Sequence, residues 1–154
     1  MLRLITMAAA MAIGLFPVAM TAQDGLHVEP LFGKTSGLKG NVRSVFLSGE
    51  NLDGRDLNLF RSLLAHGSAA DAQKMADAAE ADSQMANDTK RMMKGGELVA
   101  LYLQLPPAQG NKDNRFVLFR RMGEDSAMLI YMEGPTELDR IVNVRIKDRN
   151  QQAQ

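Results

Sequence analysis

The chain has 154 residues, of which 18 are basic and 18 are acidic, so its formal net charge at pH 7 is zero. This length suits one domain, and the lack of a basic excess argues against a general nucleic-acid-binding protein. The absence of cysteine excludes disulfides, thiol nucleophiles and zinc–thiolate sites. Apolar residues make up 45% of the chain and charged residues 23%, a balance that excludes broad intrinsic disorder.

Residues 1–22 have the three-part pattern of a secretory signal peptide. Arg3 precedes an apolar run from Leu4 to Met20, and small residues follow up to Ala22. A transmembrane anchor is less favoured, because the run is at the short limit for a spanning helix and is rich in Ala and Met. We expect cleavage after Ala22 and an exported, soluble protein, periplasmic or extracellular, that does not span the membrane once mature. It is not expected to be a lipoprotein, because no cysteine follows the run.

The segment after the leader has no regular period. Residues 23–40 contain four Gly and one Pro, so we expect a flexible N-terminal arm in which Leu31 and Phe32 dock locally. Residues 42–48 predict the first strand. Val45 and Leu47 would point to one face and Val42 and Phe46 to the other, so both faces are expected to be covered.

Two helices are predicted next. The first begins near Asp53, carries an apolar stripe at helical spacing and ends at Gly67. Its stripe consists of Leu57, Phe60, Leu63 and Leu64. The second is a long, Ala-rich helix over residues 69–94. Ser68, with Asp71 three residues later, would cap its start, and Gly95-Gly96 would end it.

Three further strands follow, at residues 97–105, 115–122 and 127–133. The last two flank a Gly-Glu-Asp-Ser turn and alternate apolar side chains, so they predict an antiparallel hairpin.

The C-terminal part begins where Gly134-Pro135 breaks the last strand. A short helix is predicted over 136–142, residues 143–147 fit either helix or edge strand, and 147–154 form a polar tail. These elements predict an α+β fold, a mostly antiparallel sheet of about four strands packed against two or three helices. Residues 41–146 would form this single domain.

The isolated histidines and serines form no recognisable catalytic or metal site. His27 lies in the arm. His66 lies at the C-terminal end of the first predicted helix, where a cationic imidazole would interact favourably with the helix dipole. The residues Gly33-Lys34-Thr35 resemble the end of a phosphate-binding loop, but Val28 stands where that loop needs its first glycine. No Gly-x-Ser-x-Gly pattern surrounds a serine. We therefore predict no catalytic residue, no cofactor and no metal ligand, and we expect that the protein is not an enzyme.

One helix face is a candidate for partner contact. Ala78, Met85 and Met92 form an apolar edge about 60–100° around the predicted long helix from Met75. Ala allows another backbone to approach closely, and Met adapts to varied surfaces. The alternative is that the methionines all pack inward beside small Ala neighbours.

Two phrases, LFGKTSGLKGNVRSVFLSGENLD near the front and RFVLFRRMGEDSAMLIYMEGPTELDRIV near the end, resemble the domain of unknown function 4252 family. Val42, Val45 and Ser48 carry the first likeness, and Tyr131 and Gly134 are among the residues that carry the second. The resemblance covers about residues 31–143. It implies a small exported protein of Bacteroidetes-like bacteria with no assigned activity, and it transfers no catalytic residues.

Three classes of function therefore remain. The first is an exported binding or interaction module with an envelope protein as its partner. The alternatives are a structural or regulatory envelope component that acts with a membrane partner and, least favoured, an enzyme. The ligand and the oligomeric state are left open.

Overall fold

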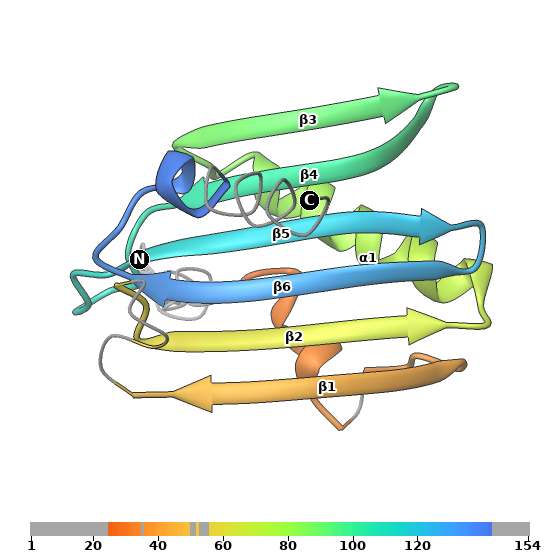
Figure 1. The fold of residues 1–154 in the computed structure, drawn as a ribbon, viewed down its shortest axis with the longest axis horizontal. Helices are drawn as coiled ribbons and strands as arrows, with labels where there is room; N and C mark the ends of the chain where they lie inside the picture. The colour runs from red at the N-terminus through yellow and green to blue at the C-terminus, as the bar shows by residue number, and fades with distance from the viewer. Residues whose placement is uncertain (1–24, 35, 50–51, 53–55, 143–154) are drawn as a thin grey trace, which may run out of the picture.

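The computed structural model describes residues 25–34, 36–49, 52 and 56–142. Six antiparallel strands form one sheet in the order β1-β2-β6-β5-β4-β3, and a helix, α1, lies across one face of it (Figure 1). The elements are β1 (Asn41–Ser48), β2 (Leu59–His66), α1 (Ala69–Ser83), β3 (Asp88–Lys94), β4 (Glu97–Leu105), β5 (Asn114–Gly123) and β6 (Ser126–Gly134). The predicted leader, residues 143–147 and the predicted polar tail lie outside the described residues.

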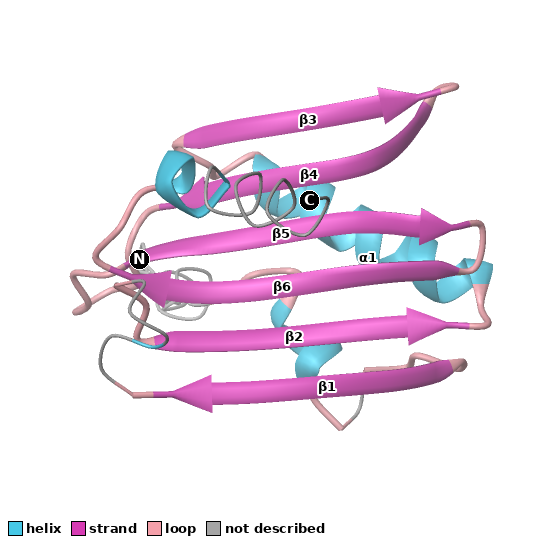
Figure 2. Cartoon of the chain, viewed as in Figure 1, coloured by secondary structure: helices cyan, strands magenta, loops and turns pink. Residues whose placement is uncertain are grey.

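The expected fold class is wrong. The sheet has six strands rather than about four, and one long helix, of 15 residues, accompanies it (Figure 2). In the described part of the chain the other helical segments are short, and they include a 3-10 helix at Glu29–Phe32 and a turn and a half over 138–142. The fold is therefore mostly β.

The first predicted helix is in fact strand β2, which pairs with β1 on one side and β6 on the other. Leu63 and Ala65 are buried on the face that packs against α1, whereas Phe60 belongs to the apolar cluster of the opposite face. A strand that contacts neighbours on both faces needs a near-continuous apolar run, which also matches helical spacing. Asp53, the predicted cap, lies outside the described residues.

The second predicted helix begins as expected but ends early. The Ser68 hydroxyl accepts a hydrogen bond from the Asp71 amide, 3.2 Å away. The helix ends at Ser83, and residues 88–94 form β3 instead of further helical turns. Gly95-Gly96 is the turn of the β3–β4 hairpin, with φ of 58° and 79°, a conformation that favours glycine.

The remaining predicted strands are confirmed. Residues 42–48 lie in β1 and residues 97–105 form β4. The predicted hairpin corresponds to β5 and β6, in which Leu118 stands opposite Ile130. The helix predicted over 136–142 begins later, at residue 138.

Apolar side chains fill both sides of the sheet. One cluster lies between the sheet and α1 and includes Met75, Leu101 and Phe119, all fully buried. A smaller cluster on the opposite face joins Phe116 and Ile130 to residues outside the sheet, and Leu57 and Leu138 are among these. The central strands are thus covered on both faces.

The segment before β1, which was expected to be a flexible arm, contributes to the first cluster. Leu26, Val28 and Leu31 are each no more than 4% exposed. The expected docking of Leu31 is therefore present, and Phe32 packs half-buried beside it. This segment lies beside α1, toward the β1 side of the sheet (Figure 1).

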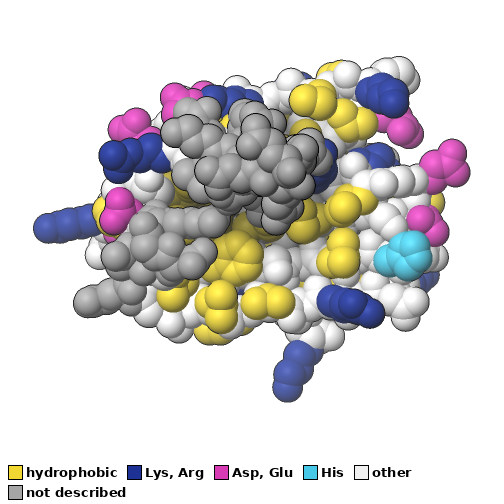
Figure 3. All heavy atoms as spheres, in the orientation of Figure 1, with side chains coloured by type: hydrophobic (Ala, Val, Ile, Leu, Met, Phe, Trp, Pro, Cys, Tyr) yellow, Lys and Arg dark blue, Asp and Glu magenta, His cyan; other side chains and the backbone are white. Residues whose placement is uncertain are grey.

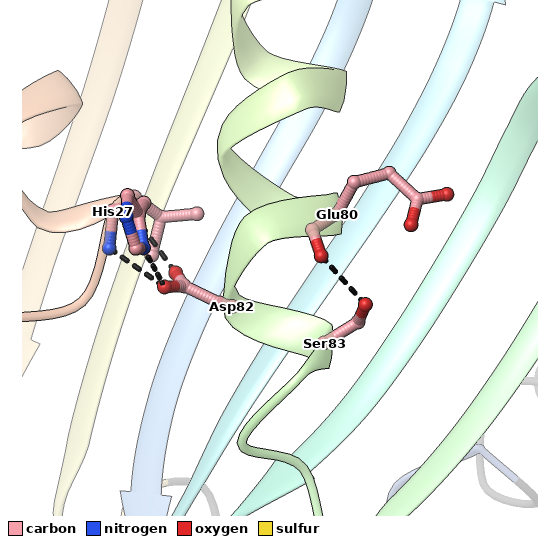
Figure 4. Close-up of polar contacts among 5 residues, drawn as sticks. His27, Glu80, Asp82 and Ser83 are labelled. Atoms are coloured by element: carbon pink, nitrogen blue, oxygen red, sulfur yellow. Dashed lines mark hydrogen bonds and ion pairs between the residues drawn. The ribbon is translucent and has the colours of Figure 1, made fainter.

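A buried carboxylate attaches the start of this segment to the end of α1. Asp82 accepts hydrogen bonds from the amides of His27, at 2.7 Å, and Val28, at 3.1 Å. The His27 ring also lies against it, with 2.9 Å between Nδ1 and Oδ1 (Figure 4). One residue further on, the Ser83 hydroxyl donates to the carbonyl of Glu80 at 2.6 Å, at the last turn of the helix.

A second buried carboxylate, at the other end of α1, holds the residues that lead into β1. Asp71 accepts hydrogen bonds from the amides of Gly40, at 2.7 Å, and Lys39, at 3.0 Å. Burial alone would raise the pKa of Asp71, but these amide hydrogen bonds and that with Ser68 outweigh it and lower the pKa. Glycine is required at position 40, because a Cβ there would lie 2.7 Å from the carbonyl oxygen of His66. Asp71 therefore fixes where β1 begins.

Candidate functional site

The residues predicted to contact a partner do not share one helix face. Ala78 lies on α1, half-buried and packed against the core. Met85 follows the helix and Met92 belongs to β3, and they are 41% and 61% exposed. Because α1 ends at Ser83, the continuous apolar edge expected from the sequence does not form. A role for Met85 and Met92 in partner contact stays a prediction.

Strand β1 is exposed along its whole length, although half of its residues are large and apolar. All eight residues are exposed, and Val45, Phe46 and Leu47 are 49%, 56% and 51% exposed. Phe46 stands opposite Arg61 and Val42 opposite Ala65, so both point to the α1 side, whereas Val45 and Leu47 point to the other side. Figure 3 shows hydrophobic side chains gathered at the lower margin, where β1 lies.

The backbone of β1 is also open on one side. β1 stands at the end of the sheet and pairs with β2 over eight residues without a register shift. An edge strand directs the N–H and C=O groups of alternate residues away from its neighbour, where another strand can bind them. Within the described ranges, β2 is the one strand that pairs with β1.

Strand β3, at the opposite edge, carries the features that protect an edge. Four of its seven residues are charged: Asp88, Lys90, Arg91 and Lys94. A hydrogen bond from Lys90 to Asp139 raises the pKa of Lys90, and the pairing with β4 shifts register between Met92 and Met93. Charges and bulges discourage pairing with a further strand. β1 has a single charged residue, Arg43, and no such shift.

An arginine to which the described residues supply no carboxylate partner lies beside this open edge. The Arg61 guanidinium lies over the ring of Phe46, with 5.1 Å between Cζ and the ring centroid. Its Nε is buried and makes no hydrogen bond. Among the described residues no Asp or Glu forms an ion pair with Arg61. A buried donor without a partner is costly, so such a group often marks an interaction that is completed by another molecule.

The chain segment that contains β1 is basic. Residues 33–49 contain Lys34, Lys39 and Arg43 and no acidic residue, and β2 adds Arg61. These four side chains are exposed or half-buried. Acidic residues occur in the β1–β2 connection, where 3.8 Å separates Oδ2 of Asp56 from Nη1 of Arg140, and on β6, where Glu133 stands opposite Leu59. In Figure 3, Lys and Arg side chains project from the described part of the lower margin, where no Asp or Glu side chain is visible.

A tyrosine–glutamate pair lies next to Arg61 on the α1 side of the sheet. Tyr131 stands opposite Arg61 in the β2–β6 pairing, and its hydroxyl donates to Glu133 at 2.5 Å. Burial, followed by this hydrogen bond, raises the pKa of Tyr131 well above its usual value. The hydroxyl therefore keeps its proton at physiological pH. In this arrangement the hydroxyl is a hydrogen-bond donor to Glu133.

The two histidines lie on different elements. His27 contacts Asp82, and His66 ends β2 rather than a helix, with its Nδ1 2.5 Å from the Ser126 hydroxyl. The expected interaction of His66 with a helix dipole is therefore wrong. In the part of the chain that the structure describes, no group of three or more His, Cys, Asp or Glu side chains is placed to hold a metal ion. The described helices include none that is long and apolar enough to cross a membrane.

Residues 15–145 match the sequence profile of a protein family, the family of unknown function DUF6108. The chain belongs to DUF6108. The resemblance stated above is confirmed in its coarser part, an uncharacterised domain family, and its assignment to family 4252 is not confirmed. Comparison with curated proteins gives no match.

Sequence reasoning missed β1 as a candidate site. The strand itself was predicted. Its place at an open edge depends on the pairing of β2 with β6, which could not be foreseen because β2 was predicted to be a helix. One signal was present in the sequence. Apolar residues on both faces of residues 42–48 suggested that both faces would be covered, whereas both are exposed.

Proposed function

We propose that this chain is an exported binding module that recruits a protein partner by strand addition at β1. The observation that carries the proposal is the contrast between the two edges of one sheet. β1 is apolar on both faces, exposed and regular, whereas β3 is charged and has a shifted register. Strand addition to an exposed sheet edge is a common mode of peptide recognition.

The physical gain from such pairing has two parts. A partner strand supplies hydrogen bonds to the outward N–H and C=O groups of β1, which water otherwise solvates. It also covers the exposed parts of Val45, Phe46 and Leu47, each about half exposed. Full burial of such a side chain contributes about 1.5–3 kcal/mol, so covering the exposed half contributes roughly 1 kcal/mol each.

The fold supports β1 as a binding edge because it fixes the strand on its inner side. Asp71 holds the backbone at Gly40, and eight consecutive residues pair with β2. A strand held in this way loses little conformational entropy when a partner binds, which favours affinity. Export remains a proposal that depends on the predicted leader.

The test compares three forms of the mature chain as baits in extracts of the source cells. Leu47→Lys places a charge on the open edge, and Met122→Lys is the matched control, because Met122 is also an exposed apolar residue on a strand, β5, and is not part of either predicted contact surface. Quantitative mass spectrometry should find a protein that the wild type and Met122→Lys enrich and Leu47→Lys loses. Equal enrichment by all three baits, with similar thermal midpoints, would contradict strand addition at β1.

A further inference from the structure

We propose that the partner segment is an extended strand in which acidic residues alternate with apolar residues. This inference rests on the proposed function of β1 and adds the chemistry of its partner. The acidic residues are placed on the α1 side of the sheet, beside Phe46 and Arg61. The apolar residues are placed on the other side, beside Val45 and Leu47.

The alternation follows from the two faces of β1. On the side away from α1, Val45 and Leu47 offer adjacent apolar surface, which an apolar partner residue covers. On the α1 side, the small and exposed residues Ser44 and Ser48 flank Phe46. Because side chains of a strand alternate between faces, a partner that matches both sides of β1 alternates in the same way.

Arg61 gives the α1 side its preference for an acid. Its guanidinium lies over the exposed ring of Phe46, and its Nε is buried without a hydrogen-bond partner. A strand added to β1 lies about 10 Å from β2, twice the usual spacing between strands. That distance is within the combined reach of an arginine and a glutamate side chain. A partner carboxylate would therefore give Arg61 the charged partner that the described residues do not supply.

The charged residues around β1 also favour an acidic partner. Lys34 and Lys39 lie before β1, Arg43 lies on the side of β1 away from α1, and residues 33–49 carry no acid. These charges attract an acidic segment to the edge, whereas Arg61 selects the side on which its acids lie. The same charges disfavour a second copy of the chain as the occupant. Pairing of β1 with β1 would bring two identical basic edges together, whereas an acidic strand would be attracted to this edge.

The experiment measures binding of labelled synthetic peptides to the mature chain by fluorescence anisotropy. The probe is a peptide of about seven residues, a usual strand length, that alternates Val and Glu. A matched peptide alternates Val and Lys, and a third carries Pro at the centre of the Val/Glu sequence, which removes a pairing amide. Arg61→Gln tests the charged contact, and Lys94→Gln on β3 controls for the loss of one positive charge elsewhere.

The wild type is expected to bind the Val/Glu peptide about tenfold more tightly than the Val/Lys peptide, and salt should weaken the preference. Arg61→Gln should lose most of this preference, Lys94→Gln should retain it, and the proline peptide should not bind. Amide hydrogen exchange should slow in β1 when the Val/Glu peptide is bound.

The outcomes distinguish a failure of the acidic-partner inference from a failure of strand addition at β1. Equal affinity for the Val/Glu and Val/Lys peptides overturns the acidic partner and leaves strand addition standing. If neither peptide binds, the acidic partner is also overturned. If, in addition, Leu47→Lys loses no partner from the extract, strand addition at β1 is overturned as well. A concentration-dependent dimer in sedimentation that Leu47→Lys abolishes makes a second copy the occupant and overturns the inference.

Discussion

The carboxylate of Asp82 accepts a hydrogen bond from the amide of His27, 2.7 Å away and 55 residues earlier in the chain. Asp71, at the other end of the same helix, accepts one from the amide of Gly40. Two carboxylates of α1 thus hold both ends of the segment that precedes β1. This attachment places apolar residues of the segment in the core and fixes the start of the candidate binding edge.

Asp82→Ala is expected to lower the free energy of unfolding by about 1–3 kcal/mol, because it leaves the buried Val28 amide without an acceptor. His27→Ala is the matched control. The His27 side chain is 61% exposed, so loss of its contact with Asp82 should cost less than about 1 kcal/mol. Urea unfolding of both variants measures the difference. Equal losses would mean that the ring contact, and not the amide hydrogen bonds, attaches the segment.

The contribution of Asp71 is expected to depend on pH. Its pKa in the folded protein is lower than the ordinary value of 3.8, so the charged form stabilises the fold. That stabilisation is complete above the unfolded-state pKa and is lost as the pH falls through the lower, folded-state pKa. Asp71→Asn should therefore be less stable than the wild type near neutral pH and approach it in acid. A stability difference that stays constant between about pH 7 and pH 2 would contradict this assignment.

Gly134→Ala is expected to destabilise the protein by at least about 1–3 kcal/mol, the usual cost of overpacking. A Cβ at Gly134 would overlap the carbonyl oxygen of Asp56 and lie 2.9 Å from Cα of Leu57, both backbone atoms. Gly123→Ala is the control, since a Cβ there meets nothing within 4 Å. Thermal unfolding compares the two variants. Similar midpoints would show that the backbone of Asp56 can move away from β6.

Leu118→Ala is expected to lower the free energy of unfolding by about 2–5 kcal/mol, because Leu118 is 4% exposed in the middle of the β5–β6 hairpin. Met122→Ala, near the end of the same strand and 59% exposed, should change it little. Denaturant titration measures both. If Leu118→Ala lowers the free energy of unfolding by less than about half a kcal/mol, the hairpin is not part of the core.

The predicted leader is expected to be removed on export. Mass spectrometry of the exported protein should find an N-terminus near Gln23, after the apolar run and its small closing residues. An intact Met1 in the membrane fraction would contradict export by this route.

The sequence predicts β1, β4 and the β5–β6 hairpin, because local alternation and turn residues are sufficient there. It fails at β2, where Phe60, Leu63 and Leu64 fit a helical stripe as well as a strand covered on both faces. It also fails at β3, whose residues lack an apolar alternation. Pairing with β4, a tertiary interaction, decides their conformation.

The candidate site could not be predicted because it depends on topology. An edge strand and a central strand with the pattern of residues 42–48 look the same in sequence. The order of the sheet places β1 at the edge, and the pairing with β2 brings Arg61 beside Phe46. The Met85 and Met92 hypothesis relied on a helix that continues past Ser83, where the chain instead turns into β3.

Amide hydrogen exchange of the wild-type chain, alone and with the protein that it enriches, tests the central claim most directly. Strand addition at β1 predicts slower exchange on binding in Asn41–Ser48, because the outward amides gain acceptors, while exchange in β3 stays unchanged. Protection confined to β3 or α1, with β1 unchanged, would contradict the assignment of β1 as the binding edge.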